Sequence, residues 1–337
     1  MKRSLLWASV LALLCVGPVC SGAEREELAP QSETYKPRDL VEARYGDGEN
    51  EFGLKDYGGE YLGALFFAVG SDGAIYIYDG VEGNIKVFGS DGAFVKTIKA
   101  VPWQVGVLRI VDMTVTPNGN IFVLCETFDP QECYKVFLTA AGMDTVKSVP
   151  IGVPAQGFCH SEDGYRVYSA AGIVSDQHGS VYLMDRRTWK SLKLVDGGKV
   201  LSDSAQLSTL REGVARSAGG FLSYRGRKSK TDTQGKLKLL DETGALIRDL
   251  SHLPGLPIGT DGLGNVYLKT MGSEGNVARI SKYSPEGRVQ AVIDIPGSSL
   301  LTKTYGKGDL IVAADGSIYE MIGARESVRV LKWESAR

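Results

Sequence analysis

Two groups of basic residues have the side-chain types and the spacing to bind an acidic partner. They are Arg186, Arg187 and Lys190, with Trp189 among them, and then Arg225, Arg227 and Lys228. Guanidinium and ammonium groups recognise carboxylates through charge-assisted hydrogen bonds. A fold that brings the two groups to one surface would make them a binding site for an acidic partner. Without such a fold they are solvated loops, which is how most charge runs behave.

Residues that perform catalysis are sparse and scattered. The chain has three histidines, His160, His178 and His252. A Ser-His-Asp triad or a zinc site needs a histidine whose partners are held close by. Neither a Gly-x-Ser-x-Gly motif nor a phosphate-binding glycine loop is found in the sequence. We name no catalytic residue, no metal ligand and no cofactor from these patterns, and we lean against an enzyme.

The N-terminal residues follow the pattern of a secretory signal peptide. Lys2 and Arg3 precede a short apolar stretch, and Ser21-Gly22-Ala23 offers small residues for cleavage. We therefore predict a signal peptide over 1–23 and a secreted or periplasmic chain with no membrane span after cleavage. An uncleaved anchor is the alternative, as is a lipid on Cys20, although the residues before Cys20 make a poor lipobox.

Residues 24–39 are polar, contain two prolines, and are expected to form a flexible tether. Of the cysteines beyond the signal, Cys125 and Cys133 are placed to join one hairpin loop by a disulfide. An exported chain meets an environment that permits such a bond. Cys159 would then be unpaired, and we read it as a buried thiol.

Composition indicates a folded chain with many turns. The 337 residues are 43% hydrophobic and carry a formal net charge of −2. This near-neutral balance argues against a nucleic-acid partner, because such proteins usually have a strong basic excess. The 42 glycines follow no Gly-X-Y period, so they indicate tight turns rather than collagen.

Glycine-centred turns divide residues 40–337 into repeats of four short strands. The first turn of each repeat has a glycine between β-branched and aromatic runs. These glycines are Gly73, Gly119, Gly179, Gly220, Gly264 and Gly316. They recur about every 40 to 60 residues, which is the spacing of four-stranded propeller blades. The sequence thus predicts an all-β, six-bladed β-propeller with four antiparallel strands per blade.

The last repeat lacks its fourth strand. A propeller ring has to close, or two strand edges remain exposed. The alternating stretch Leu40–Tyr45 precedes the first full repeat, so we predict that it supplies the missing outer strand. A seventh, degenerate blade between Tyr134 and Gly172 is the alternative, since that stretch is longer than the others.

The first repeat resembles an NHL repeat. The resemblance rests on the stretch from Gly46 to Leu54, on Asp72-Gly73-Ala74-Ile75-Tyr76, and on the stretch from Asn84 to Val95. The same stretches also resemble the six-bladed propellers of exported bacterial proteins. That fold hosts binding modules and metal-dependent hydrolases alike. A calcium-binding trio for the hydrolase alternative would be Glu60, Asn118 and Asp261, although Asn118 and Asp261 also suit hairpin turns.

The loops between second and third strands all leave one face of such a ring. The first two repeats contribute Asp79, Glu82, Glu126, Asp129 and Glu132 to this face. The third and fourth contribute the two basic groups and Lys230, and Lys269 and Arg325 extend them. We therefore expect a monomeric, non-catalytic binding or assembly module. Its partner would be an acidic protein or an anionic polysaccharide of the cell envelope. A calcium-dependent hydrolase or lactonase with an axial site is the alternative.

Overall fold

The computed structural model describes fifteen segments of the chain. They are residues 33–56, 61–100, 107–127, 134–140, 147–149, 171–185, 190–201, 210–212, 214–215, 221–225, 236–241, 245–271, 277–296, 310–323 and 326–336. Every regular element within these segments is a β-strand. A helix long and apolar enough to cross a membrane is not found among them.

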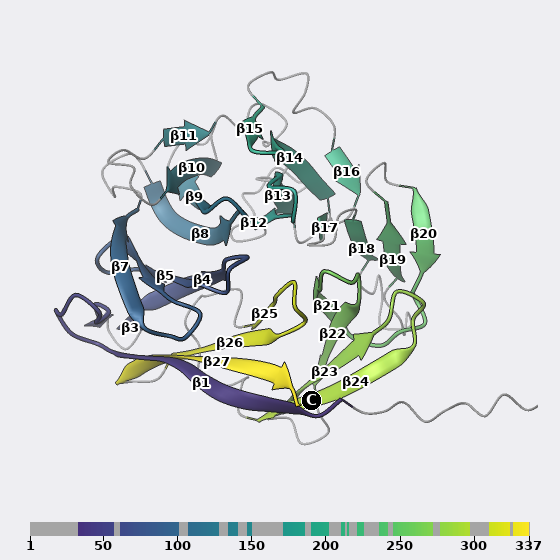
Figure 1. Ribbon diagram of the computed structural model, residues 1–337. Helices are drawn as coiled ribbons and strands as arrows, with labels where there is room; N and C mark the ends of the chain where they lie inside the picture. The colour runs from purple at the N-terminus through teal and green to yellow at the C-terminus, as the bar shows by residue number, and fades with distance from the viewer. Residues whose placement is uncertain are drawn as a thin grey trace, which may run out of the picture.

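The strands form a ring of antiparallel sheets around a common centre (Figure 1). In the described segments there are five four-stranded sheets, one five-stranded sheet and a two-stranded ribbon. The innermost strands β4, β8, β12, β17, β21 and β25 lie toward the centre in Figure 1, and the last strands lie at the rim. The predicted all-β propeller built of four-stranded antiparallel sheets is confirmed.

We number the sheets in chain order. Sheet I is β4 (Ala64–Val69), β5 (Ile75–Asp79), β6 (Asn84–Phe88) and β7 (Phe94–Lys99). Sheet II is β8 (Val107–Val115), β9 (Asn120–Thr127), β10 (Tyr134–Ala140) and β11 (Lys147–Val149). Sheet III is β12 (Ala171–Ser175), β13 (Val181–Asp185), β14 (Lys190–Asp196), β15 (Lys199–Val200) and β16 (Leu210–Glu212).

The remaining sheets continue the same order. Sheet IV is β17 (Val214–Ala215), β18 (Phe221–Arg225), β19 (Lys236–Leu240) and β20 (Leu246–Asp249). Sheet V is β21 (Leu256–Thr260), β22 (Val266–Met271), β23 (Val277–Tyr283) and β24 (Val289–Pro296). Sheet VI is β25 (Leu310–Val312), β26 (Ile318–Gly323), β27 (Ser327–Ser335) and β1 (Tyr35–Arg44). The ribbon is β2 (Lys55–Asp56) with β3 (Tyr61–Leu62).

Glycines in the left-handed region build the hairpins, as the sequence predicts. Gly73, Gly119, Gly179, Gly264 and Gly316 have φ between 76° and 83°, whereas Gly220 lies outside the described residues. The N–H of each glycine donates to the carbonyl oxygen of the residue three positions earlier. A second hydrogen bond closes each loop, as from the N–H of Gly70 to the carbonyl oxygen of Ala74. The loops therefore contain three residues, with glycine last, rather than two.

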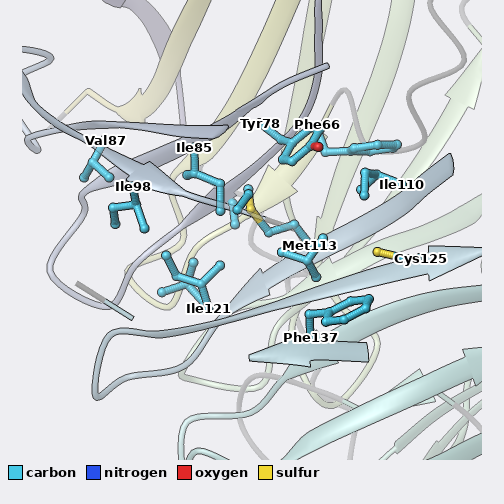
Figure 2. Close-up of a cluster of buried hydrophobic side chains, with 14 residues drawn as sticks. Phe66, Tyr78, Ile85, Val87, Ile98, Ile110, Met113, Ile121, Cys125 and Phe137 are labelled. Carbon is cyan, nitrogen blue, oxygen red and sulfur yellow. The ribbon is translucent and has the colours of Figure 1, made fainter. Parts of the chain in front are cut away.

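Apolar layers between neighbouring sheets form the core. Successive residues of a strand face opposite sides, so each sheet packs against the sheet before it and the sheet after it. Figure 2 shows one such layer, between sheets I and II, where Tyr78 and Ile85 meet Met113 and Ile121. Burying each of these side chains contributes about 1.5 to 3 kcal/mol to folding.

The strand that closes the ring comes from the N-terminal side of the chain, as predicted. β1 pairs antiparallel with β27, from Tyr35 opposite Ser335 to Arg44 opposite Ser327. The strand is longer than the predicted stretch Leu40–Tyr45. It begins at Tyr35, inside the predicted tether 24–39, because residues 35–39 find partners along the free edge of β27. Of that tether, residues 24–32 lie outside the described residues.

The stretch that the alternative assigned to a seventh blade begins within sheet II. Tyr134–Ala140 is β10, the third strand of that sheet, and Lys147–Val149 is β11, its fourth. β10 pairs with β9 from Tyr134 opposite Glu126 to Ala140 opposite Asn120. Residues 150–170 lie outside the described residues.

A bulge in β1 fits the closing strand against sheet I. The register of β1 on β27 shifts between Asp39 and Val41, which places the bulge at Leu40. The carbonyl oxygen of Leu40 approaches Gly92, the turn glycine between β6 and β7, so closely that a Cβ at Gly92 would overlap it. A side chain at position 92 is thus excluded by the ring closure itself.

Gly92→Ala should destabilise the protein more than Gly119→Ala does. Both glycines have left-handed φ, 86° and 79°, so alanine at either position carries about 1 to 3 kcal/mol of backbone strain. Only Gly92 adds the overlap with Leu40, whereas no atom lies within 4 Å of a Cβ at Gly119. Urea denaturation of the two variants measures the difference in the free energy of unfolding. Equal losses would contradict the close contact between β1 and sheet I.

Candidate functional site

We call the end of the ring where each second strand passes into the third the loop face, and the opposite end the turn face. In sheet III the chain leaves β13 at Asp185 and re-enters at Lys190, and these residues pair in the backbone register. In sheet IV it leaves β18 at Arg225 and re-enters β19 at Lys236, again a register pair. Consecutive strands alternate in direction, so both connections lie on the loop face.

The structure describes the strand ends that flank the two basic groups, and these ends lie on neighbouring sheets. Sheets III and IV are neighbours in the ring, and β14 contacts β17 (Figure 1). The backbones of Lys190 and Arg225 are described, and both stand at the loop face. The other predicted site residues, Arg186, Arg187, Trp189, Arg227 and Lys228, lie outside the described residues. The site therefore stays a prediction, with the stems of both loops on one face.

The expected acidic half of the loop face needs correction at Asp79. This carboxylate is fully buried. Its Oδ2 accepts the N–H of Gly53 at 2.9 Å, and its Oδ1 accepts the N–H groups of Val81 at 2.9 Å and Glu82 at 3.0 Å. A carboxylate with three backbone donors organises the loop after β5 and joins it to residue 53. Asp79 is a loop-building residue and not part of an exposed acidic surface.

Glu126 is also buried, with 1% of its surface exposed, so it does not belong to an exposed patch either. Of the other acids expected on this face, Glu82 is exposed, and Asp129 and Glu132 lie outside the described residues. Lys269 lies within β22, and Lys230 and Arg325 lie outside the described residues.

The segment after β1 supplies exposed acids that the sequence argument missed. Phe52 donates its N–H to the carbonyl of Arg44, and its ring is buried against sheet I. This anchor holds the segment at the loop-face end of sheet I, where Asp47, Glu49 and Asp56 are exposed. A buried aromatic inside a polar, glycine-rich stretch was the available signal for this packing.

Cys125 is buried, with none of its surface exposed. It lies in the layer between sheets I and II, where Figure 2 shows it among Ile110, Met113 and Phe137. Burial raises the pKa of this thiol, so it is a poor nucleophile at neutral pH. Its predicted partner Cys133 lies outside the described residues, as does Cys159, so the disulfide stays a prediction.

The trio considered for calcium does not form a site in the described part of the chain. Asn118 lies in the turn between β8 and β9, where its Oδ1 accepts the hydroxyl of Thr116. Asp261 lies in the turn between β21 and β22 and accepts the N–H groups of Leu263 and Asn265. Both side chains build turns on the turn face. Glu60 is outside the described residues, and no group of three or more metal-ligating side chains occurs within them.

A recurring pair of tyrosine and lysine braces the sheets near the turn face. Tyrosine is the second residue of the second strand, and lysine stands opposite it on the third strand. The pairs are Tyr182 with Lys193, Tyr267 with Lys282, and Tyr319 with Lys332. The Nζ atom of Lys193 lies 5.5 Å from the ring centre of Tyr182, and that of Lys332 lies 5.6 Å from the ring centre of Tyr319. Both arrangements are cation–π geometry.

Tyr267 links sheet V to sheet VI. Its hydroxyl lies 3.1 Å from Oδ2 of Asp261 and 3.2 Å from the carbonyl oxygen of Gly316. Burial raises the pKa of Tyr267, and the charge of Asp261 raises it further. For Lys282, burial acts to lower the pKa, but the hydrogen bond that its ammonium donates to Glu33, together with the nearby Tyr35, leaves the pKa above its ordinary value.

Comparisons with known proteins give neither a family nor a function for this chain. No protein-family model and no curated protein sequence matches the chain. Among solved structures it is similar to virginiamycin B lyase from Staphylococcus aureus (13% identity, 90% of this chain and 89% of that chain, TM-score 0.41). It is also similar to aldose sugar dehydrogenase from Streptomyces coelicolor (12% identity, 91% of this chain and 100% of that chain, TM-score 0.49). At these levels the similarities carry no argument, and the NHL resemblance stays a prediction.

Stability should fall with rising pH above about pH 10, where tyrosines and lysines of an unfolded chain lose their protons. The raised pKa values of Tyr267 and Lys282 keep both groups protonated in the folded state, so their contributions are complete below that pH and are lost above it. Tyr267→Phe should weaken this dependence. At neutral pH it should cost about 1 kcal/mol, because Asp261 and Gly316 each keep another donor. Urea denaturation at several pH values tests both points, and an unchanged alkaline slope would contradict the buried phenol.

Proposed function

We propose that this chain is an exported, non-catalytic binding module that holds an acidic partner on its loop face. One observation carries the proposal: the stems of the two basic loops leave the same face of neighbouring sheets, at Asp185 and Lys190 and at Arg225 and Lys236. Loops 186–189 and 226–235 hold five arginines and lysines and one aspartate. Their proximity would concentrate positive charge that each loop alone would lose to solvent screening.

A ring of six blades is part of this proposal. The apolar clusters support it, because they join each sheet to the next: I with II, II with III, III with IV, IV with V, V with VI, and VI back to I. Sheet III also fits a four-stranded blade. β15 and β16 both pair with β14, at its two ends, and so act as one interrupted outer strand.

The position of the exposed acids argues for an acidic rather than a basic partner near sheets III and IV. In a six-bladed ring sheet I lies opposite sheet IV, so the segment with Asp47, Glu49 and Asp56 is far from the strand ends at Arg225 and Lys236. Two acids of sheet III, Asp185 and Glu212, pair with Lys190 in the backbone register. The separation leaves a positive region whose charge is not neutralised by the segment after β1.

The alternative, a calcium-dependent hydrolase with an axial site, has less support. Two of its three candidate ligands, Asn118 and Asp261, already build turns on the turn face. Inner-strand side chains of sheet II bond to the neighbouring inner strand of sheet III instead. The hydroxyl oxygens of Thr114 and Ser175 are hydrogen-bonded at 3.0 Å, and Oδ2 of Asp112 accepts the N–H of Ile173 at 3.1 Å. The catalytic role would need ligands from outside the described residues.

Charge reversal at the loop face tests the binding module. Replacing Arg186, Arg187, Arg225 and Arg227 by glutamate should abolish retention of the chain, without its predicted signal peptide, on immobilised polyglutamate or polygalacturonate. The parent chain should be retained by at least one of these polyanions and elute as salt rises, because exposed charges are screened by ions. The measurement is the salt concentration at elution from each column.

A matched control separates the proposed site from net charge. Lys96, Lys199, Arg248 and Arg288 are exposed on third-to-fourth-strand turns or outer strands, and reversing all four changes the net charge equally. This variant should still bind, although at somewhat lower salt. Equal loss of retention in both variants, or a parent chain that neither polyanion retains, would overturn the loop-face proposal.

A further inference from the structure

We propose that Glu33, Thr34 and Tyr35 form a clasp that latches the closing strand to sheet V and so controls where the ring opens. β1 is an outer strand of sheet VI, yet the residues at its start bond to a neighbouring sheet. This contact adds to the backbone pairing of β1 with β27. The clasp stands independently of any ligand on the loop face.

The central contact of the clasp is an ion pair between Glu33 and Lys282 of β23. The Nζ atom lies 3.1 Å from Oε2 and 3.4 Å from Oε1 of Glu33. The lysine side chain is 11% exposed, whereas that of Glu33 is 36% exposed. A lysine this deeply buried needs a carboxylate, because an unpaired buried ammonium costs several kcal/mol. The pair is therefore more than a surface salt bridge.

The repeat shows why the carboxylate comes from outside sheet V. In sheet III the equivalent Lys193 pairs with Asp196 of its own sheet at 2.7 Å. In sheet VI the equivalent Lys332 pairs with Glu334, also of its own sheet, at 2.6 Å. The matching positions after Lys282 are Ser284 and Pro285, which carry no charge.

Asp261 does not fill the missing acid position. Its Oδ1 accepts two backbone N–H groups, and its Oδ2 is within hydrogen-bond distance of Asn265 Nδ2 and the hydroxyl of Tyr267. Glu33 therefore supplies in sheet V the acid that the sheet's own third strand lacks.

Two more bonds hold the clasp in place. The hydroxyl of Tyr35 donates to the carbonyl oxygen of Gly316 at 3.4 Å, and the N–H of Ala336 donates to the carbonyl oxygen of Thr34 at 2.7 Å. With the fit of Leu40 against Gly92 farther along, β1 contacts sheets V, VI and I. Loss of the clasp should thus free β1 before any other outer strand opens.

Hydrogen exchange of backbone amides tests the clasp. Glu33→Gln should accelerate exchange in β1 and at the β27 amides bonded to it about threefold to tenfold, while amides of sheet III stay unchanged. Asp196→Asn, which breaks the equivalent pair of sheet III, should leave β1 unchanged. This control separates a local clasp from a general effect of losing one carboxylate.

A charge exchange provides the second arm. Glu33→Lys combined with Lys282→Glu should return the β1 exchange rates to within about twofold of the parent, because the ion pair is restored in reverse. The clasp is refuted if Glu33→Gln leaves β1 exchange unchanged, if it accelerates all sheets equally, or if the exchanged pair protects β1 no better than Glu33→Gln.

Discussion

The ring exists because a strand from near one end of the chain forms hydrogen bonds along a strand from the other end. Every other sheet is built from consecutive strands and could form by local hairpins, but sheet VI needs residues 35–44 to meet residues 327–335. Such a pairing joins positions far apart in sequence, so it carries the largest loop-closure cost of the fold. The apolar layers on either side of sheet VI depend on it, since without β1 the residues Val41 and Ala43 would leave the cluster shared with sheet I.

The turn face and the loop face of the ring differ in what their polar residues do. On the turn face, buried aspartates build turns and tyrosine–lysine pairs brace single sheets. Backbone bonds there also join one sheet to the next, as when Gly262 donates its N–H to the carbonyl of Ala314. Polar side chains on the turn face are therefore occupied in structural contacts. The loop face carries the strand ends Asp185, Lys190, Arg225 and Lys236, from which the two basic loops leave. This division explains why Asp261 and Asn118 proved to be turn residues.

The fold was predictable because its signals are local. A glycine between two β-branched runs needs a left-handed conformation wherever it occurs, so Gly73 or Gly316 marks a hairpin without knowledge of the rest of the chain. The start of β1 was not predictable in the same way. Residues 35–39 have little strand character, include Pro37, and become a strand because the edge of β27 is available to them.

The candidate site was less predictable, for a physical reason. A charged residue in a loop reads the same in sequence whether it faces solvent or turns inward. Asp79 was expected on an acidic surface, yet its carboxylate accepts three backbone N–H groups. One of these donors, Gly53, comes from a different segment, so its contact with Asp79 could not be read from the local sequence. Lys282 likewise gives no local sign that its acid lies 249 residues away.

The bond between Thr34 and Ala336 has a consequence for how the chain could be rewired. Because these residues touch at the start of β1 and the end of β27, a short peptide joining them would make the fold circular without displacing a strand. New ends could then be opened in any hairpin, such as the turn around Gly119, where an added Cβ would meet no other atom within 4 Å. The closing strand would become an ordinary member of a continuous sheet, and the seam of the ring would move to wherever the chain was cut.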